Sequence, residues 1–397
     1  MNVRFFRISI LVLLSFTILS VPVFRGFAEP RSASDPNDNS LLSGVIVTPS
    51  VSAQSAVLTE AESGEILFAK AADIRLPMAS TTKIMTALVA LEHASPETVI
   101  SVPREAVGIE GSSIYLFEGE QLTLEQLLYA LLLSSANDAA TAIAYGVAGG
   151  VELFAALMND KAAELGLCDS HFTNPHGLDD PEHYTTAREL AVITRAALAN
   201  DRIRKIVATR KATIPQNGNE GMRLLINHNK LLRLYDGAIG VKTGFTKRSG
   251  RCLVSAAERN GVTLIAVTLN APNDWNDHRE MFDQGFSQLV SVPLCTESGI
   301  SVQVPVVGGL AEAVAVSCPE ERHLVLPTEH GTITASVELP RFLYAPVGSG
   351  DEVGRVVWRM DGQIVAEVPL VATESAASPE RPGWFRRFLA KLFHHEK

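Results

Sequence analysis

Ser80 and Lys83 form the only Ser-x-x-Lys pair of the chain, in the segment Ser80-Thr81-Thr82-Lys83. On a helix, residues i and i+3 share a face, so the hydroxyl and the amine can meet. A serine becomes a nucleophile beside a base, and lysine serves as that base only where burial or a neighbouring cation lowers its pKa from about 10.4. The pair predicts nucleophilic catalysis, although average residue usage produces such a pair about once by chance in a chain of this length.

A second polar pair, Ser135 and Asn137, interrupts an apolar run in the segment LLLSSANDAA. Serine and asparagine at such a junction often cap a helix, and this is the simplest interpretation. The functional interpretation is a hydroxyl that relays a proton to a leaving group and an amide that holds the substrate backbone. The pair alone does not decide between them.

A third group, Lys242-Thr243-Gly244, ends an apolar strand in GAIGVKTGFTKRSG. Lysine and threonine together suit a substrate carboxylate, and glycine lets the backbone approach a ligand closely. The ammonium of Lys242 is also a cation that would lower the pKa of Lys83 if the two were neighbours.

The elements that must position these groups are predicted from periodicity. Residues 54–70 read as a β-hairpin that turns at Ser63-Gly64. Helices and further strands follow in the chain, and this order predicts an α+β fold with an antiparallel sheet flanked by helices. The predicted helices are 78–94, 123–148, 151–166, 186–199 and 277–290, and the predicted strands are 237–243, 250–257 and 262–270.

The composition changes after Pro293. Residues 299–371 contain short β-rich runs, among them a hairpin with an Asp361-Gly362 turn, and no convincing helix. We therefore predict a catalytic domain at 45–293, a small all-β domain at 294–371 and a linker at 372–383. Cys295 and Cys318 would either pair at the edge of the small domain or remain free buried thiols.

The two ends of the chain both point toward a membrane. Residues 1–28 carry a basic start, an apolar run and small residues before Ala28, which predicts a signal peptide followed by a flexible leader at 29–44. The alternative is an uncleaved membrane anchor. Residues 384–397 predict an amphipathic helix with aromatic residues on one side and Lys, Arg and His on the other, typical of the membrane interface. Docking of this helix on the protein's own core is the alternative.

The whole chain has 397 residues and a net charge of −10. This length predicts two or three domains, and the acidic balance argues against nucleic-acid binding, which depends on clustered Lys and Arg. No phosphate loop, dinucleotide fingerprint or His-Glu-x-x-His motif occurs, so no cofactor and no metal are predicted. His176 and His183 lack a compact metal-ligand spacing and favour a structural role in their loop.

The order and spacing of the three motifs, 55 and 107 residues apart, resemble a known family. The chain is similar to the serine-type D-alanyl-D-alanine carboxypeptidases, the low-molecular-mass penicillin-binding proteins. The motifs PMASTTKIMT at 77–86, NPHGLD at 174–179, HYTTAR at 183–188 and KTGFT at 242–246 carry the resemblance. It implies a transpeptidase-like domain, a β-rich second domain and a C-terminal amphipathic anchor.

The resemblance also implies roles for individual residues. Ser80 would attack the penultimate D-alanine of a peptidoglycan stem peptide, with Lys83 as its general base. Ser135 would pass a proton to the departing D-alanine, and Asn137 would hold the peptide backbone. The backbone N–H groups of Ser80 and Phe245 would form the oxyanion hole.

The terminal carboxylate of the substrate would bind to Lys242 and Thr243, with Gly244 beside them and Arg279 assisting. β-Lactam antibiotics would acylate the same serine. The implied location is exported, on the outer face of the cytoplasmic membrane and attached peripherally through the C-terminal helix.

Three alternatives remain open in the sequence. The first is a β-lactamase of the same fold, but Glu182 and Glu189 lack the usual setting of the glutamate that activates its deacylating water. The second is a penicillin-sensing module without turnover. The third is an endopeptidase that uses the same residues on cross-links.

Overall fold

The computed structural model describes residues 6–10, 41–42, 45, 47–216, 221–295 and 301–379. The chain divides into two compact units, Leu42–Val290, and Ser291–Lys397 together with Met1–Leu41. The predicted cleavage point after Ala28, the end of the predicted linker and the predicted helix at 384–397 lie outside the described residues.

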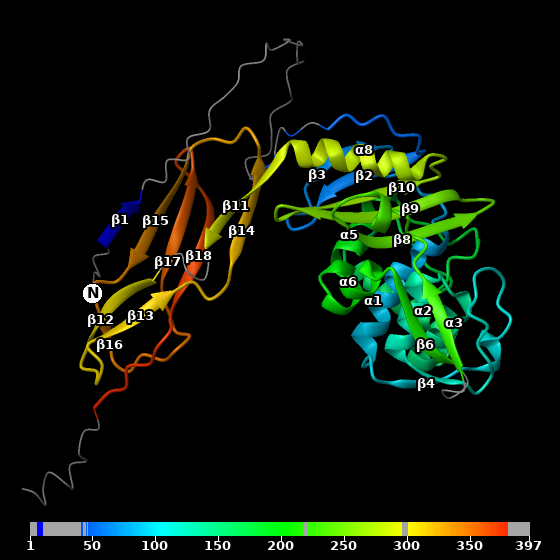
Figure 1. The fold of residues 1–397 in the computed structure, drawn as a ribbon, viewed down its shortest axis with the longest axis horizontal. Helices are drawn as coiled ribbons and strands as arrows, with labels where there is room; N and C mark the ends of the chain where they lie inside the picture. The colour runs from blue at the N-terminus through cyan, green and yellow to red at the C-terminus, as the bar shows by residue number, and fades with distance from the viewer. Residues whose placement is uncertain are drawn as a thin grey trace, which may run out of the picture. The chain divides into compact units, whose positions relative to one another are not determined.

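The first unit is built on a five-stranded sheet in the order β3-β2-β10-β9-β8 (Figure 1), and every pairing in it is antiparallel. The hairpin predicted at 54–70 is present. Val267 in the central strand pairs with Val57 on one side and Val254 on the other, so β-branched residues occupy the buried middle of the sheet. The strands are β2 (Ser55–Glu60), β3 (Ile66–Lys70), β8 (Ala238–Thr246), β9 (Gly250–Arg259) and β10 (Val262–Leu269).

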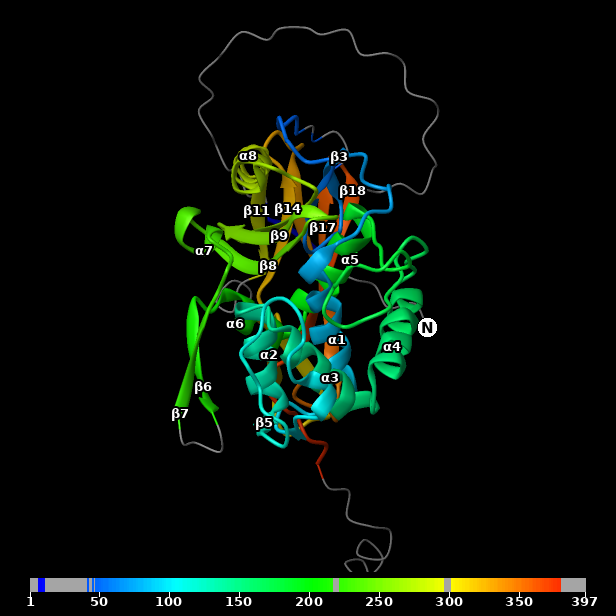
Figure 2. The same cartoon turned by 90° about the vertical axis from the view of Figure 1, so that its right-hand side faces the viewer.

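Helices cover both faces of this sheet (Figure 1 and Figure 2). Helix α8 lies along one face, and the other helices gather on the opposite side, so the sheet is the middle layer. The helices are α1 (Lys83–His93), α2 (Leu124–Leu133), α3 (Asn137–Ala148), α4 (Val151–Glu164), α5 (Ala187–Leu198), α6 (Asp201–Ala208), α7 (Leu231–Leu234) and α8 (Asp274–Ser287).

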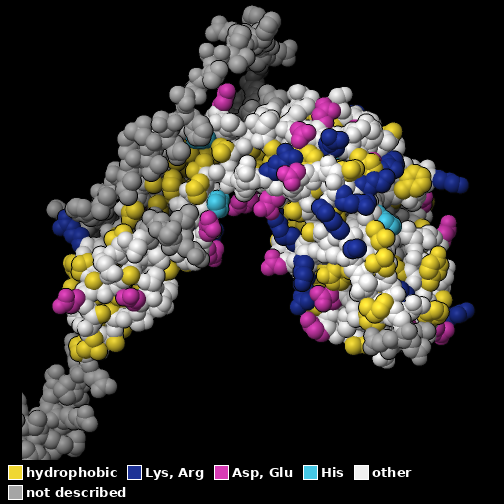
Figure 3. Space-filling view, in the orientation of Figure 1, with side chains coloured by type: hydrophobic (Ala, Val, Ile, Leu, Met, Phe, Trp, Pro, Cys, Tyr) yellow, Lys and Arg dark blue, Asp and Glu magenta, His cyan; other side chains and the backbone are white. Residues whose placement is uncertain are grey.

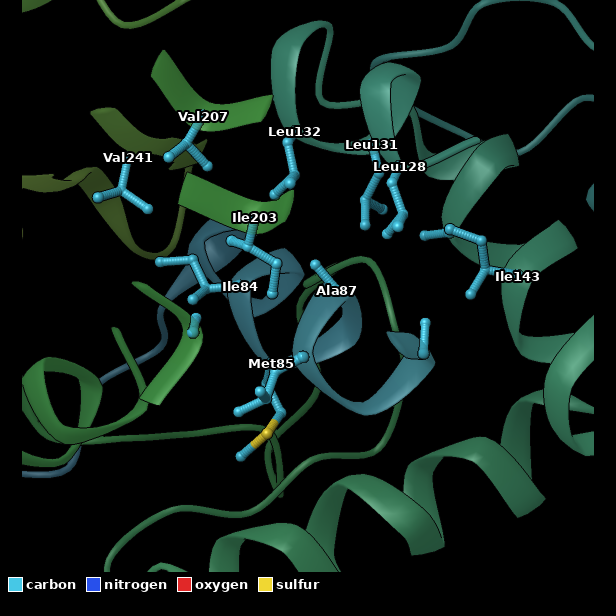
Figure 4. Packing of buried hydrophobic residues seen from close by; sticks show 14 of the residues in the cluster. Ile84, Met85, Ala87, Leu128, Leu131, Leu132, Ile143, Ile203, Val207 and Val241 are labelled. Carbon is cyan, nitrogen blue, oxygen red and sulfur yellow. The ribbon is translucent and has the colours of Figure 1, made fainter. Parts of the chain in front are cut away.

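Helix α1 is enclosed by the rest of the unit. Its first eight residues, 83–90, are all buried, as expected for a helix that is apolar around most of its circumference. Figure 4 shows how its side chains meet those of α2, α3, α6 and β8. The labelled members of this core are Ile84, Met85, Ala87, Leu128, Leu131, Leu132, Ile143, Ile203, Val207 and Val241.

The helix predicted at 123–148 is wrong as a single helix, because α2 and α3 are separated at residues 134–136. Thr123 begins α2 with a capping box, in which its hydroxyl accepts from Gln126 N–H and the Gln126 side chain accepts from Thr123 N–H. Ser135 has a φ of +59°, in the left-handed region that ends a right-handed helix. The break therefore coincides with the polar pair that the sequence singled out.

Several elements were not predicted. Residues Ala79–Thr82 form a short 3-10 helix, η1, ahead of α1. Strands β4 (Val99–Ser101) and β5 (Gln121–Thr123) pair with each other, and so do β6 (Lys211–Gln216) and β7 (Gly221–Ile226). Both pairs lie outside the main sheet.

The second unit is all β in its described part, as the composition predicted. Its main sheet has the order β1-β15-β17-β18-β13-β12-β16, and β11 pairs with β14. Asp361 and Gly362, at φ values of +51° and +87°, make the predicted turn between β17 and β18. The strands are β11 (Leu289–Cys295), β12 (Ser301–Val307), β13 (Ala313–Ser317), β14 (Arg322–Pro327), β15 (Ile333–Leu339), β16 (Leu343–Tyr344), β17 (Glu352–Met360) and β18 (Gln363–Ala372).

Two further features concern the chain ends and the cysteines. Strand β1 (Phe6–Ile10) pairs antiparallel with β15, and because it belongs to the predicted signal peptide this pairing requires a chain that keeps that segment. Cys295 and Cys318, which the sequence left either paired or free, form a disulfide.

The predicted α+β class followed by a β unit is confirmed. Within the described part of the chain, no single helix meets the criteria for a membrane span, and one bent pair, α3 with α4, meets them jointly.

Candidate active site

The nucleophile candidate lies on η1, directly before α1. In a 3-10 helix the side chains at i and i+3 eclipse, and Lys83 Nζ lies 2.9 Å from Ser80 Oγ. Ala79, the residue before the serine, has a φ of +48°. A non-glycine residue in the left-handed region costs roughly 1–2 kcal/mol, and such strain gathers at functional sites.

Lys83 makes two further contacts to oxygen atoms. Its Nζ donates to Asn137 Oδ1 at 2.7 Å and to the His176 carbonyl oxygen at 2.6 Å. A neutral amine has two N–H donors and one lone pair. If these two acceptors take both donors, the lone pair faces Ser80, and the serine hydroxyl becomes the donor in that contact. The geometry therefore suits a neutral Lys83 that accepts the serine proton.

The surroundings favour that neutral form. Lys83 has no exposed surface, and burial lowers the pKa of its amine well below the usual value. The charge of Lys242 lowers this pKa further, while Asp138 acts in the opposite direction. Burial also lowers the pKa of Lys242 to about 7. Burial therefore favours the neutral form of both amines over the charged form.

Lys242 connects the sheet to the junction between α2 and α3. Lys242 lies on β8, and its Nζ donates to Ser135 Oγ at 3.0 Å and to the Thr243 carbonyl oxygen at 2.9 Å. The left-handed backbone of Ser135 ends α2 and presents its hydroxyl to this lysine. The structure therefore brings together five residues of the three motifs: Ser80, Lys83, Ser135, Asn137 and Lys242. The individual contacts among them could not be predicted from the sequence.

Gly244 explains how β8 approaches the nucleophile turn, which is the 3-10 helix η1 that carries Ser80. A Cβ added at this glycine would lie 3.0 Å from the Met78 carbonyl oxygen and 3.1 Å from Ser80 N. Phe245 follows directly, with an exposed side chain, and Thr243 precedes with a half-buried one. The backbone of β8 thus passes against η1, next to the N–H group of the serine.

The loop before α2 is fastened to this site by buried polar contacts. Asn137 Nδ2 donates to the Glu110 carbonyl oxygen at 2.6 Å, so the amide spans from the loop to Lys83. Asp138, with no exposed surface, accepts from Ile114 N and Leu116 N, both at 3.1 Å. The sequence analysis did not single out Asp138, although it directly follows Asn137 in the motif.

A buried ion pair holds the same loop from its other side. Arg223 on β7 donates to both carboxylate oxygens of Glu120, at 2.5 and 2.9 Å, and to the Ile114 carbonyl oxygen at 2.9 Å. Both side chains are almost completely buried. Removal of one member of such a pair leaves an uncompensated charge and typically costs about 3–5 kcal/mol. The β6–β7 hairpin thus has a structural connection to the site that its sequence did not indicate.

The two histidines of the 174–186 segment lie behind the nucleophile turn. Thr173 N–H donates to His183 Nδ1 at 3.1 Å, which assigns the proton to Nε2, and Nε2 lies 2.8 Å from Thr82 Oγ1. Burial, with smaller effects from nearby charges, lowers the pKa of His183 to about 4. Burial and the charge of Lys83 lower the pKa of His176 to about 3. Both rings are neutral at pH 7. The ring of His183 contacts the turn at Thr82, and the ring of His176 accepts from Leu178 N–H.

Other predicted residues lie apart from the cluster. Arg279 is exposed on α8, where its charge acts on the phenol of Tyr235, and no described contact joins it to the lysines. Glu189 accepts from Cys168 N, Asp169 N and Ser170 Oγ, which occupies both of its oxygens. Glu182 is exposed. Among the described residues, no group of three or more His, Cys, Asp or Glu side chains is arranged to hold a metal ion.

The sequence matches two family models. Residues 44–273 match the family described as D-alanyl-D-alanine carboxypeptidase, and residues 294–378 match the C-terminal domain of penicillin-binding protein 5. A D-alanyl-D-alanine carboxypeptidase of Bacillus subtilis, DacF, is 32% identical over 332 residues, which cover 81% of this chain and 85% of that protein. The Escherichia coli enzyme DacA is 28% identical over 396 residues, which cover 95% of this chain and 96% of that protein.

Solved structures show the same likeness. The crystal structure of penicillin binding protein 5 from Haemophilus influenzae has a TM-score of 0.60 and 28% identity, and the match covers 84% of this chain and 99% of that one. A D-alanyl-D-alanine carboxypeptidase from Mycobacterium tuberculosis has a TM-score of 0.58 and 35% identity over 63% of this chain and 96% of that one. The first match extends over both units of the chain, and the second has the extent of the first unit alone.

The close approach at Gly244 generates a prediction. In a Gly244→Ala variant the new methyl group must push β8 away from η1, because its nearest neighbours include backbone atoms. The shift needed is a few tenths of an ångström, whereas displacement of a reacting group by about 1 Å costs on the order of a hundredfold in rate. We therefore expect a smaller loss, about tenfold, in the acylation rate of Ser80, measured by stopped-flow with a serine-directed acylating probe.

Gly150→Ala is the matched control for this substitution. Gly150 has extended backbone, and the nearest atom to an added Cβ is Glu152 Oε2 at 3.9 Å. The control should acylate at the parent rate. An unchanged rate in Gly244→Ala would show that the contact between β8 and η1 does not position the nucleophile.

Proposed function

The chain belongs to the D-alanyl-D-alanine carboxypeptidase family, and from this premise we propose that it removes the terminal D-alanine from peptidoglycan stem pentapeptides through an acyl-enzyme on Ser80. The observation that carries the proposal is the contact of Ser80 Oγ with the buried amine of Lys83. A serine beside a neutral amine can attack a carbonyl carbon without any cofactor.

In the first step, the Ser80 oxygen bonds to the carbonyl carbon of the penultimate D-alanine, and its proton passes to the lone pair of Lys83. The negative charge that develops on the carbonyl oxygen is held by the N–H groups of Ser80 and Phe245. Gly244 allows this arrangement because it brings the two backbone segments together. One such donor contributes about 3–4 kcal/mol to transition-state stabilisation in comparable acyl-transfer sites.

In the second step, the C–N bond breaks and the terminal D-alanine leaves with a proton on its nitrogen. Ser135 supplies this proton and in turn recovers the one that Lys83 took from Ser80, so that both lysines end the step in their starting protonation state, and the contact with Lys242 Nζ at 3.0 Å holds the Ser135 hydroxyl in place. Lys242 and Thr243 hold the terminal carboxylate of the substrate, and Asn137 holds the peptide backbone. Water then hydrolyses the ester on Ser80 and restores the free enzyme.

β-Lactams resemble the D-alanyl-D-alanine end and acylate the same serine. The contacts of the glutamates favour a slowly released adduct over rapid turnover. Glu189 is occupied by three donors away from the cluster, and Glu182 is exposed, so neither is arranged to activate the deacylating water of a β-lactamase. We therefore place the carboxypeptidase activity ahead of β-lactamase activity.

A Ser80→Ala variant tests the nucleophile. It should release no D-alanine from a pentapeptide substrate and form no covalent adduct with a labelled penicillin, because the attacking oxygen is missing. Mass spectrometry of peptides should locate the parent adduct on Ser80. Ser301→Ala, at an exposed position of the β unit, is the control and should behave as the parent. An adduct on any other residue would contradict the assignment.

The pKa values of the two lysines predict the pH profile of kcat/KM. The profile should rise with pH as Lys83 loses its proton and fall as Lys242, with a pKa lowered to about 7, loses the charge that binds the carboxylate. In Lys242→Arg the guanidinium stays charged to about pH 12, so the alkaline decline should disappear although the maximum is lower. Lys230→Arg, an exposed control, should keep both limbs. An unchanged alkaline limb in Lys242→Arg would assign it to another group.

We also propose that the enzyme is exported and attached peripherally to the outer face of the cytoplasmic membrane. D-Alanyl-D-alanine ends of peptidoglycan lie outside that membrane, which requires export. From residue 380 to the end, the sequence has five Lys or Arg against two Glu, in a chain of net charge −10. A basic amphipathic segment with aromatic residues favours anionic membrane surfaces.

Truncation tests the attachment. A chain that ends at Pro379 keeps every described residue but lacks the basic amphipathic segment. It should lose sedimentation with phosphatidylglycerol-containing liposomes while its D-alanine release from soluble pentapeptide stays at the parent rate. Equal sedimentation of the two chains would contradict attachment through residues 384–397.

A further inference from the structure

One end of the β unit exposes a cluster of large apolar side chains. Val307, Leu310, Phe342 and Tyr344 are 48%, 73%, 44% and 64% exposed, and we call these four residues the tip patch. Figure 3 shows hydrophobic side chains at this end of the unit, over β12 and β16. Single exposed apolar residues are normal on a soluble protein, but a contiguous group marks a contact surface.

The four residues are contiguous by their contacts. Val307 and Tyr344 are register partners in the parallel pairing of β12 with β16. The Phe342 and Tyr344 rings meet edge to face, with centroids 5.3 Å apart. Leu310 follows Val307 after two glycines, in the uncharged run Val307-Gly308-Gly309-Leu310-Ala311. The patch is therefore one surface rather than four isolated side chains.

The chain leaves the β unit at this same patch. Leu310 N donates to the Ala377 carbonyl oxygen at 2.9 Å, and Ala376 exchanges two backbone hydrogen bonds with Val347. The basic amphipathic segment begins at Trp384, seven residues after Ala377. Seven residues span at most about 25 Å when fully extended. Any membrane that holds this segment must therefore lie within reach of the tip patch.

We propose that the tip patch inserts into the membrane interface as a second contact, beside the attachment through residues 384–397. This inference rests on the proposed peripheral attachment. Phenylalanine and tyrosine suit the headgroup region because each has an apolar ring, and tyrosine adds a polar end. Leu310, with the highest exposure of the four, would reach furthest toward the acyl chains.

The two contacts differ in the chemistry they require. The C-terminal segment is basic and depends on anionic lipid, whereas the run from Val307 to Ala311 has no charged side chain and depends on apolar burial alone. The tip patch would therefore add affinity of similar size on neutral and anionic vesicles. Together the two contacts would orient the β unit, because attachment at a single point leaves its orientation free.

A fluorescent label at position 310 tests the insertion directly. The full-length chain would carry Cys168→Ser, which removes the exposed free thiol, together with Leu310→Cys labelled with an environment-sensitive fluorophore. On phosphatidylcholine–phosphatidylglycerol vesicles the emission should shift to the blue, and lipids with spin-labelled acyl chains should quench it. Ile364→Cys, 51% exposed at the opposite end of β18, is the matched control and should show neither change.

Each outcome has a definite meaning. If the chain binds vesicles but the label at 310 is not quenched, the tip patch inference is wrong and the attachment stands. A label that is already shielded without vesicles would mean that residues 384–397 cover the patch, which also overturns the inference. If the full-length chain does not bind vesicles at all, the proposed attachment fails and the inference falls with it.

A second measurement does not depend on the label. Leu310→Ser with Tyr344→Ser should lower the vesicle partition coefficient of the full-length chain at least tenfold, the effect expected from the loss of one buried apolar side chain alone. Ile364→Ser should leave partition unchanged. Both variants should release D-alanine from soluble pentapeptide at the parent rate. Equal partition of the double variant and the parent would contradict insertion.

Discussion

The site depends on the burial of two lysine amines in one polar cluster. Lys83 and Lys242 have 0% and 1% exposure, and each charged form would carry a desolvation cost of several kcal/mol. The charge of one lowers the pKa of the other, so the cluster favours a state with fewer than two charges. A serine hydroxyl needs a neighbouring base to become a nucleophile, and a neutral amine beside Ser80 is the base that we propose.

The rest of the first unit holds these amines in place. Helix α1 is buried on nearly every side, so Lys83 has no route to solvent, and β8 carries Lys242 into the same region. Left-handed backbone at Ala79 and Ser135 orients the two hydroxyls at some cost in stability. Buried contacts of Asp138 and the Arg223–Glu120 pair fix the loop that orients Asn137. These buried contacts thus stabilise the fold close to the two strained residues.

The convergence of the motif residues could be predicted from the sequence better than the local structure around them. Ser80, Lys83, Ser135 and Lys242 were identified from residue type and spacing, and the strands that carry regular alternation were found close to their observed bounds. The break at Ser135 was missed because the apolar run continues on both sides of it. Arg223 was missed because a lone arginine in a short strand has no periodic signature, and its partner Glu120 lies 103 residues away. Arg279 stays a prediction, since it is exposed on α8 and no described contact joins it to the lysines.

The arrangement of donors supports the proposal that lysine, not histidine, is the base. His176 and His183 lie close to the nucleophile turn, but burial lowers the pKa of each ring far below 7. His183 Nδ1 is already an acceptor for Thr173 N–H, and its Nε2 faces Thr82. His176 offers its backbone carbonyl to Lys83 rather than its ring. Each histidine therefore lacks a free lone pair toward Ser80 or the basicity to keep a proton. Burial lowers the pKa of the Lys83 amine, and in its neutral form the amine directs its lone pair at Ser80, which is why we propose it as the base.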